Sequence, residues 1–187
     1  MRAFKKIIAF VSAMIVTLGL GSMPVFAADV SETQDVEYLP YSTYNSQSSE
    51  LLDKSYFYCD GTDSFFSETP IQESLVGSSN NVITGTLEYF YDGLDSQNRP
   101  QYTVTATIVS SPLTLKSSRM KTMAEGTSSW HTNEEDHSGH TGKNTRSYVY
   151  TKNPPTNPYC KVRLWATDSE DFELYIGEDT LYDAKSH

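Results

Sequence analysis

Residues 161–167 decide the fold class, and they read Lys161-Val162-Arg163-Leu164-Trp165-Ala166-Thr167. Val162, Leu164 and Ala166 alternate with residues that are polar or amphipathic. This period of two is typical of a β-strand with one buried face, because successive side chains of a strand point to opposite faces of its sheet. The stretch therefore predicts a strand that packs its apolar side in a core.

The same alternation recurs in four other runs, residues 83–91, 101–109, 148–150 and 172–176. Threonine, valine, isoleucine and tyrosine, which favour strands, are frequent in these runs. Turn-forming residues separate them, as at Asp92-Gly93 and in the proline-rich residues 153–158. We therefore expect residues 81–187 to form an all-β domain. The expected architecture is an antiparallel β-sandwich, with an immunoglobulin-like sandwich or a small barrel as the alternative.

The first 27 residues predict a secretory signal peptide. Three basic residues come first: Arg2, Lys5 and Lys6. An apolar run follows from Ile7 to Leu20, and residues 25–27 supply the small residues of a cleavage site. The run is shorter than the ~20 residues that a membrane-spanning helix needs. We expect cleavage after Ala27 or Ala28, and a secreted, extracellular product without membrane insertion.

The charge of the chain excludes one class of partner. Its 187 residues hold 24 acidic and 14 basic side chains, and loss of the signal peptide would change the net charge from −10 to −13. An acidic protein does not bind nucleic acid by bulk electrostatics, because such binding needs Lys and Arg to neutralise phosphates. The same charge disfavours docking to anionic membranes.

Residues 28–80 contain ten acidic side chains and one basic side chain. A Ser/Tyr-rich composition with charge of one sign predicts an acidic leader that is partly disordered. Residues 55–66 include five aromatic residues, which are costly to leave in water. We expect this part of the leader to dock on the domain.

Cys59 and Cys160 are the only cysteines. In a secreted protein an even pair indicates a disulfide, which is our expectation. The bond would close a loop of about 100 residues, for which chain entropy gives roughly 4.7 kcal/mol of stabilisation. The alternative is two free, buried thiols.

A histidine-rich stretch offers candidate metal ligands. Three of the four histidines lie within residues 131–140, beside a run of carboxylates. Imidazole and carboxylate are suitable ligands for zinc or copper, and the candidate ligands are His131, His137, His140 and Asp136. The alternative is a solvated loop that joins two strands. Residues 92–98 pose a similar choice between a weak calcium site and an ordinary hairpin turn.

Aromatic residues suggest a second candidate site. Tyr148, Tyr150, Trp165 and Tyr175 alternate onto strand faces, where such rings could stack on sugar rings or on a partner protein. The candidate aromatic face is Tyr148, Tyr150 and Trp165. The alternative is that these rings fill the core between two sheets.

The sequence contains no GxSxG-type nucleophile elbow, and the histidines cluster in one polar stretch. We therefore expect a non-enzymatic monomer that binds a surface protein or a glycan at or beyond the cell surface. The alternatives are a secreted metal-binding protein that uses residues 131–140 and a secreted hydrolase with acidic catalytic residues. The signal peptide, acidic leader and Thr- and Tyr-rich strands together resemble small exported proteins of Gram-positive bacteria. This resemblance implies an extracellular location and no particular site residues.

Overall fold

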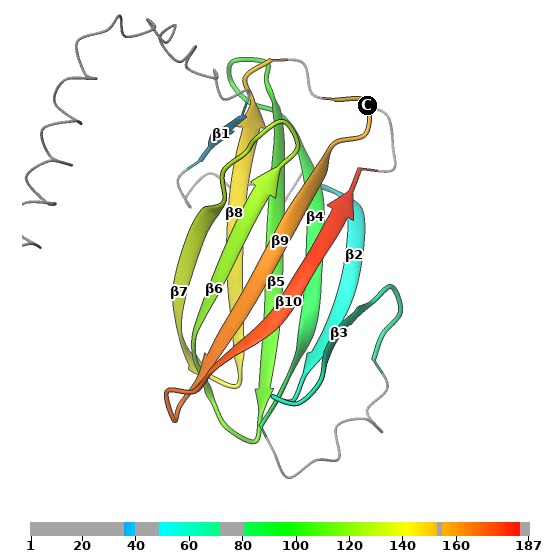
Figure 1. Cartoon of the computed structure of the whole chain (residues 1–187). Coiled ribbons are helices and arrows are strands. Elements are labelled where there is room, and N and C mark those ends of the chain that lie inside the picture. Colours follow the sequence, from blue (N-terminus) through cyan, green and yellow to red (C-terminus); the bar gives the residue numbers. More distant parts are fainter. Residues whose placement is uncertain (1–35, 40–48, 72–80, 153–154, 184–187) are drawn as a thin grey trace, which may run out of the picture. The chain divides into compact units, whose positions relative to one another are not determined.

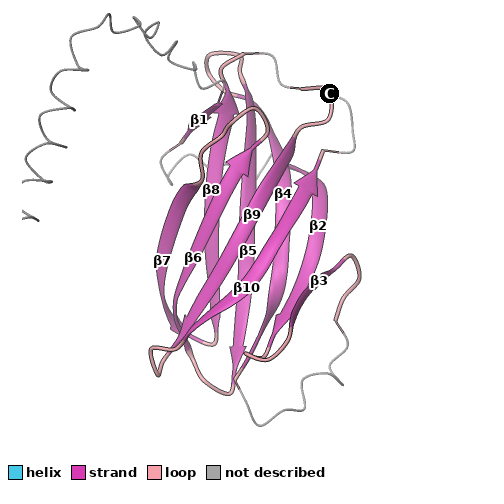
Figure 2. Ribbon diagram, viewed as in Figure 1, coloured by secondary structure: helices cyan, strands magenta, loops and turns pink. Residues whose placement is uncertain are grey.

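The computed structural model describes residues 36–39, 49–71, 81–152 and 155–183. These residues form ten strands and no helix (Figure 2). The expected signal peptide lies outside the described residues, as do residues 28–35, 40–48 and 72–80 of the acidic leader. In the described part of the chain no helix is long and apolar enough to span a membrane.

The strands form two antiparallel sheets, which appear as two layers in Figure 1. Sheet A has six strands in the order β1 (Val36–Tyr38), β8 (Thr141–Tyr150), β5 (Pro100–Ser111), β4 (Val82–Leu94), β2 (Glu50–Cys59) and β3 (Ser64–Ser67). Sheet B has four strands in the order β10 (Glu173–Tyr182), β9 (Tyr159–Asp168), β6 (Leu115–Ala124) and β7 (His131–Gly139). Among the described strands the two ends of each sheet remain unjoined, so the alternative of a closed barrel is wrong.

One hydrophobic core lies between the sheets, and the alternation along β9 explains its composition. Val162, Leu164 and Ala166 are at most 1% exposed, as the sequence predicts. From sheet A, Tyr89 and Tyr148 enter the same core, and their hydroxyl oxygens lie 2.7 Å apart. A hydrogen bond between two buried hydroxyls satisfies both groups away from water.

Residues from the acidic stretch 28–80 supply β1, β2 and β3 of sheet A. Phe57 of β2 is fully buried, and Phe66 of β3 packs against the core beside β10. Gly177 makes this approach feasible, because it follows a β-bulge in β10 and has a φ of 139°. A Cβ atom at this position would lie 2.8 Å from Cε2 of Phe66.

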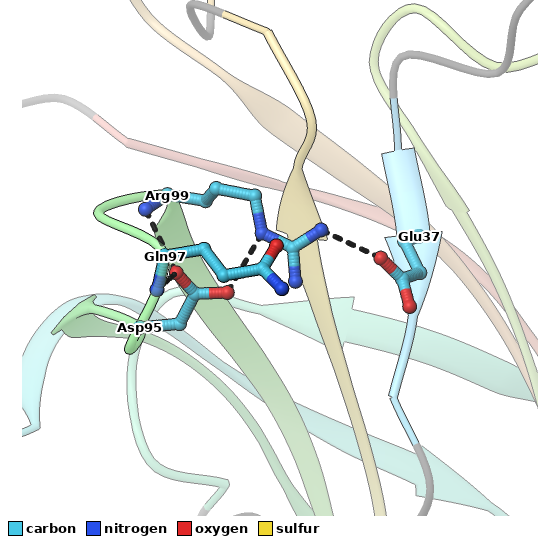
Figure 3. Close-up of polar contacts among 4 residues, drawn as sticks. All are labelled: Glu37, Asp95, Gln97 and Arg99. Carbon is cyan, nitrogen blue, oxygen red and sulfur yellow. Dashed lines mark hydrogen bonds and ion pairs between the residues drawn. The ribbon is translucent and has the colours of Figure 1, made fainter.

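The hairpin between β4 and β5 is closed by Asp95 (Figure 3). Its carboxylate accepts hydrogen bonds from the backbone N–H groups of Gln97, at 2.9 Å, and Arg99, at 2.8 Å. Arg99 also binds this carboxylate through Nε at 2.7 Å, and its Nη1 reaches Glu37 of β1 at 2.7 Å. The Asp95 oxygens thus hold an ordinary turn, and Arg99 ties this turn to Glu37 of β1.

The expected disulfide is wrong, because Cys59 and Cys160 are free, buried thiols. The Cys59 sulfur lies 3.9 Å from the carbonyl oxygen of Tyr175, and Tyr175 pairs with Trp165 of β9. Trp165 is five residues from Cys160 along β9, a length of about 17 Å. Bridged cysteines need Cα atoms within about 7 Å. The two thiols therefore lie too far apart along the strands to pair.

The stretch 131–140, for which a solvated loop was the alternative to a metal site, is mostly strand β7. Its residues alternate between half-buried and exposed, although nearly all of them are polar. Asn133 faces the interior, where its side-chain amide donates hydrogen bonds to Asn144 Oδ1, at 2.8 Å, and to the Thr145 carbonyl, at 3.1 Å. Hydrogen bonds to β8 thus hold the inner side of β7, which lacks the alternating apolar residues by which a strand is recognised in a sequence.

Candidate binding surface

The outward side of sheet B presents an aromatic and cationic cluster. Because Val162, Leu164 and Ala166 point into the core, Arg163 and Trp165 of β9 point away from it. We call this cluster the Trp165 surface and define it as Arg119, Lys121, Trp130, Lys161, Arg163, Trp165, Glu173, Tyr175 and Glu178.

Three neighbouring strands place the centre of this surface in one row. Arg119 of β6 pairs with Trp165 of β9, which pairs with Tyr175 of β10. The Trp165 and Tyr175 rings have centroids 4.9 Å apart, and the Arg119 guanidinium carbon lies 4.8 Å from the Trp165 centroid. Lys121 Nζ is 5.5 Å from the same ring. Such contacts stabilise cations over the indole face by about 0.5–1 kcal/mol each at exposed sites.

The next row repeats this chemistry. Lys121 pairs with Arg163, which pairs with Glu178. The Arg163 guanidinium lies over the Trp130 ring, 4.2 Å from its centroid. Both tryptophans of the chain therefore contact cations on the outward side of sheet B.

Two ion pairs hold the arginines in place. Arg119 Nη2 lies 2.8 Å from the Glu173 carboxylate, and Arg163 Nε lies 2.6 Å from the Glu178 carboxylate. Exposed pairs of this kind contribute only about 0–1 kcal/mol to stability, so their main effect is to fix the guanidinium planes. Within the described residues, Lys121 and Lys161 have no ion-pair partner.

Of the three residues predicted to form an aromatic binding face, the structure places only Trp165 on the outer surface. Tyr148 and Tyr150 are 0% and 2% exposed and belong to the core. Burial raises the pKa of both phenols, as expected for hydroxyls removed from water. The alternative, that these two rings fill the space between the sheets, describes them correctly.

The four candidate metal ligands do not come together. His131 and His137 lie on the inner side of β7, six residues apart, which corresponds to about 20 Å of strand. His140 follows β7, and its Nδ1 lies 2.9 Å from the Ser110 carbonyl oxygen. Asp136 pairs with Ser117 and is exposed on the opposite side of β7. In the described part of the chain no three His, Cys, Asp or Glu residues are grouped as metal ligands would be.

The histidines instead have structural contacts. The His131 ring stacks on Tyr38 of β1 with centroids 3.7 Å apart, and burial, with Arg146 nearby, lowers its pKa. His137 Nε2 lies 2.8 Å from Ser118 Oγ, and its ring covers Gly142. Burial lowers the pKa of His137 as well.

Sequence reasoning named Tyr175 beside Trp165 but missed Arg119, Trp130 and Arg163 as members of the same surface. The available signal was the outward half of residues 161–167, which alternates lysine, arginine and tryptophan, together with the basic residues 116–121. Their juxtaposition depends on the β6–β9 pairing, which the sequence does not specify. Comparisons with protein-family models, curated proteins and solved structures find no match to this chain.

Proposed function

We propose that this chain is an exported, non-enzymatic binding protein with a β-sandwich fold, and that the Trp165 surface is its ligand site. The fold proposal is supported by two antiparallel sheets that share one core. The proposal of export rests on the signal-peptide pattern of residues 1–27.

The observation that carries the proposal is the row formed by Arg119, Trp165 and Tyr175. Large aromatic residues are usually buried, yet Tyr175 is 48% exposed and Trp165 lies outside the core. Exposed tyrosine, tryptophan and arginine are the residues that dominate binding energy at interfaces. The ring contacts and ion pairs orient these side chains before a ligand arrives, which lowers the entropy cost of binding.

Export is tested first, by expressing the full chain in a Gram-positive host. We expect the protein in the culture medium, with an N-terminus at residue 28 or 29 by mass spectrometry. Retention in the cell with residue 1 intact would contradict the export proposal.

Binding is tested with the protein recovered from that medium, on arrays of glycans and extracellular proteins. We expect Trp165→Ala to weaken binding to the captured ligand at least about 30-fold, which corresponds to the roughly 2 kcal/mol that marks the lower limit for a hot-spot residue. Phe172→Ala is the matched control, because Phe172 is 61% exposed in the turn that joins β9 and β10. The proposal fails if both variants bind like the wild type, or if the purified protein hydrolyses a glycan, peptide or ester.

A further inference from the structure

We infer that the Trp165 surface binds an anionic polysaccharide that lies along strands β6 and β9. This inference rests on the proposed binding function and adds the chemical class of the ligand. It is carried by the distribution of charge across sheet B and by the positions of the two tryptophans.

Positive charge concentrates in the two central strands of sheet B. The described residues contain ten Lys and Arg side chains, and five of them lie in β6 or β9: Lys116, Arg119, Lys121, Lys161 and Arg163. Asp168 is the only acidic residue of these two strands. A cationic strip is therefore built into a protein whose net charge is −10.

Three of these cations form a compact group, the cationic triangle of Lys121, Lys161 and Arg163. Lys121 pairs directly with Arg163, and Lys161 lies two residues from Arg163 on the same side of β9. Diagonal neighbours such as Lys121 and Lys161 are about 7–8 Å apart. One carboxylate, that of Glu178, balances Arg163, whereas the two lysines have no ion-pair partner among the described residues. Three positive charges thus face one negative charge.

The tryptophans border the cationic triangle. Trp130 stacks on Arg163, and Trp165 lies next to Lys121. The Arg163 guanidinium stacks on Trp130 and binds Glu178 through Nε, which leaves its Nη groups, unpaired among the described residues, to bind carboxylate, sulfate or phosphate. The apolar faces of sugar rings pack on such aromatic side chains, while Lys and Arg bind acidic groups carried by the sugar. The combination fits a sugar that carries an anion.

The acidic residues of the flanking strands restrict the shape of the ligands that can bind. β7 and β10 carry acidic residues on either side of the strip, including Glu134, Asp136, Glu173 and Glu178. Neighbouring strands are about 4.8 Å apart, so the favourable strip is narrow. A broad acidic protein or a nucleic-acid duplex would meet these carboxylates, whereas a single extended polymer lying along the strands would not. The charge pattern therefore favours a polysaccharide chain.

The test compares two polymers with one backbone, polygalacturonate and its fully methyl-esterified form, using the full-length chain processed by its host. In affinity electrophoresis we expect polygalacturonate to retard the protein, and the uncharged ester to do so at least about tenfold more weakly. Retardation should weaken as salt rises from 50 to 200 mM, because salt screens exposed charges. Chondroitin sulfate as a second polymer distinguishes sulfate from carboxylate recognition, and binding of either polymer supports the inference.

Variants connect the binding to the cationic triangle. We expect the double variant Lys121→Glu/Lys161→Glu to bind about tenfold more weakly, from the loss of two partly exposed charge contacts. Lys143→Glu is the matched control, because Lys143 is exposed on β8 of sheet A and should bind within about twofold of the wild type. Lys121→Gln/Lys161→Gln, which removes charge without adding any, replaces the first variant if circular dichroism shows that the Glu variant is unfolded.

The inference is overturned if neither acidic polymer binds, if ester and acid bind equally, or if both lysine variants bind like the wild type. Binding of a neutral glycan that is lost in Trp165→Ala would refute the anionic ligand and retain the proposed function. Polygalacturonate binding that is unchanged in Trp165→Ala and in the lysine variants would refute both the inferred anionic ligand and the proposed function of the Trp165 surface.

Discussion

Replacing Gly177 by alanine tests how sheet A and sheet B meet at β3 and β10. The added Cβ would meet two obstacles: a backbone with φ of 139°, and the Phe66 ring at 2.8 Å. A non-glycine residue in such a backbone region costs about 1–3 kcal/mol. Displacing a ring that packs against the core adds about 1–3 kcal/mol, the usual cost of overpacking. We therefore expect Gly177→Ala to lower the free energy of unfolding by about 2–6 kcal/mol.

Gly139→Ala separates the two contributions. Gly139 has a comparable φ of 122°, and no atom lies within 4 Å of where its Cβ would be. The free energy of unfolding of this control variant should therefore fall only by the cost of the strained backbone, about 1–3 kcal/mol. Unfolding in urea, followed by far-ultraviolet circular dichroism, measures both variants by the linear extrapolation. A second substitution, Phe66→Leu, should recover part of the extra loss in Gly177→Ala, because it shortens the side chain that the new methyl group meets.

The reasoning is refuted if Gly177→Ala is no less stable than Gly139→Ala. It is also refuted if Phe66→Leu destabilises the Gly177→Ala protein as much as it destabilises the wild type. Either result would mean that the Phe66 ring does not pack over the bulge of β10.

Three further predictions concern the core and the inner side of β7. Ellman's reagent should find two thiols, Cys59 and Cys160, after denaturation without reductant, and almost none in the native protein, since both are buried. If the denatured protein contains no free thiol, the two cysteines form the disulfide that the sequence predicts. Leu164→Ala should lower the free energy of unfolding by about 2–5 kcal/mol in the same urea assay, because Leu164 is fully buried, and a loss below 1 kcal/mol would contradict its place in the core. Stability should fall as pH drops below about 6.5: burial lowers the native pKa of His137 and His131, so the unfolded state binds protons more readily and is favoured by acid. His137→Gln should reduce the difference between urea midpoints at pH 7.5 and pH 5.5, and an unchanged difference would rule out His137 as a contributor.

Strands with an apolar face could be predicted from the sequence, because their signal is local. In residues 161–167 every second residue is apolar, and these residues are the ones that the structure buries. β7 has the same geometry without the same signal. Its inner residues, such as His131 and Asn133, are polar and find their partners on β1 and β8, at a distance in the sequence. Alternation of hydrophobicity does not detect a strand of this kind.

Which aromatic residues face outward depends on the register of each strand. The prediction of an aromatic binding face was therefore right for one of its three residues and wrong for the other two. Trp165 lies on the outer surface because its neighbours in β9 are apolar. For Tyr148 and Tyr150 the alternation was ambiguous, since the intervening Val149 is itself apolar, and the structure buries all three residues. The separation of Cys59 from Cys160 follows from the contact of β2 with β10 and the pairing of β10 with β9, and no spacing along the chain encodes it.

The division of aromatic residues between core and surface gives the protein two separate optical reporters. The core contains Tyr89, Tyr102, Tyr148 and Tyr150, whereas Trp130 and Trp165 contact cations on the outward side of sheet B. Excitation at 295 nm, which tryptophan absorbs and tyrosine largely does not, therefore monitors only that outward side. A ligand that settles there should change the emission, while damage confined to the packed interior should leave it unaltered. Fluorescence of the unlabelled protein can thus distinguish occupancy of the surface from loosening of the core.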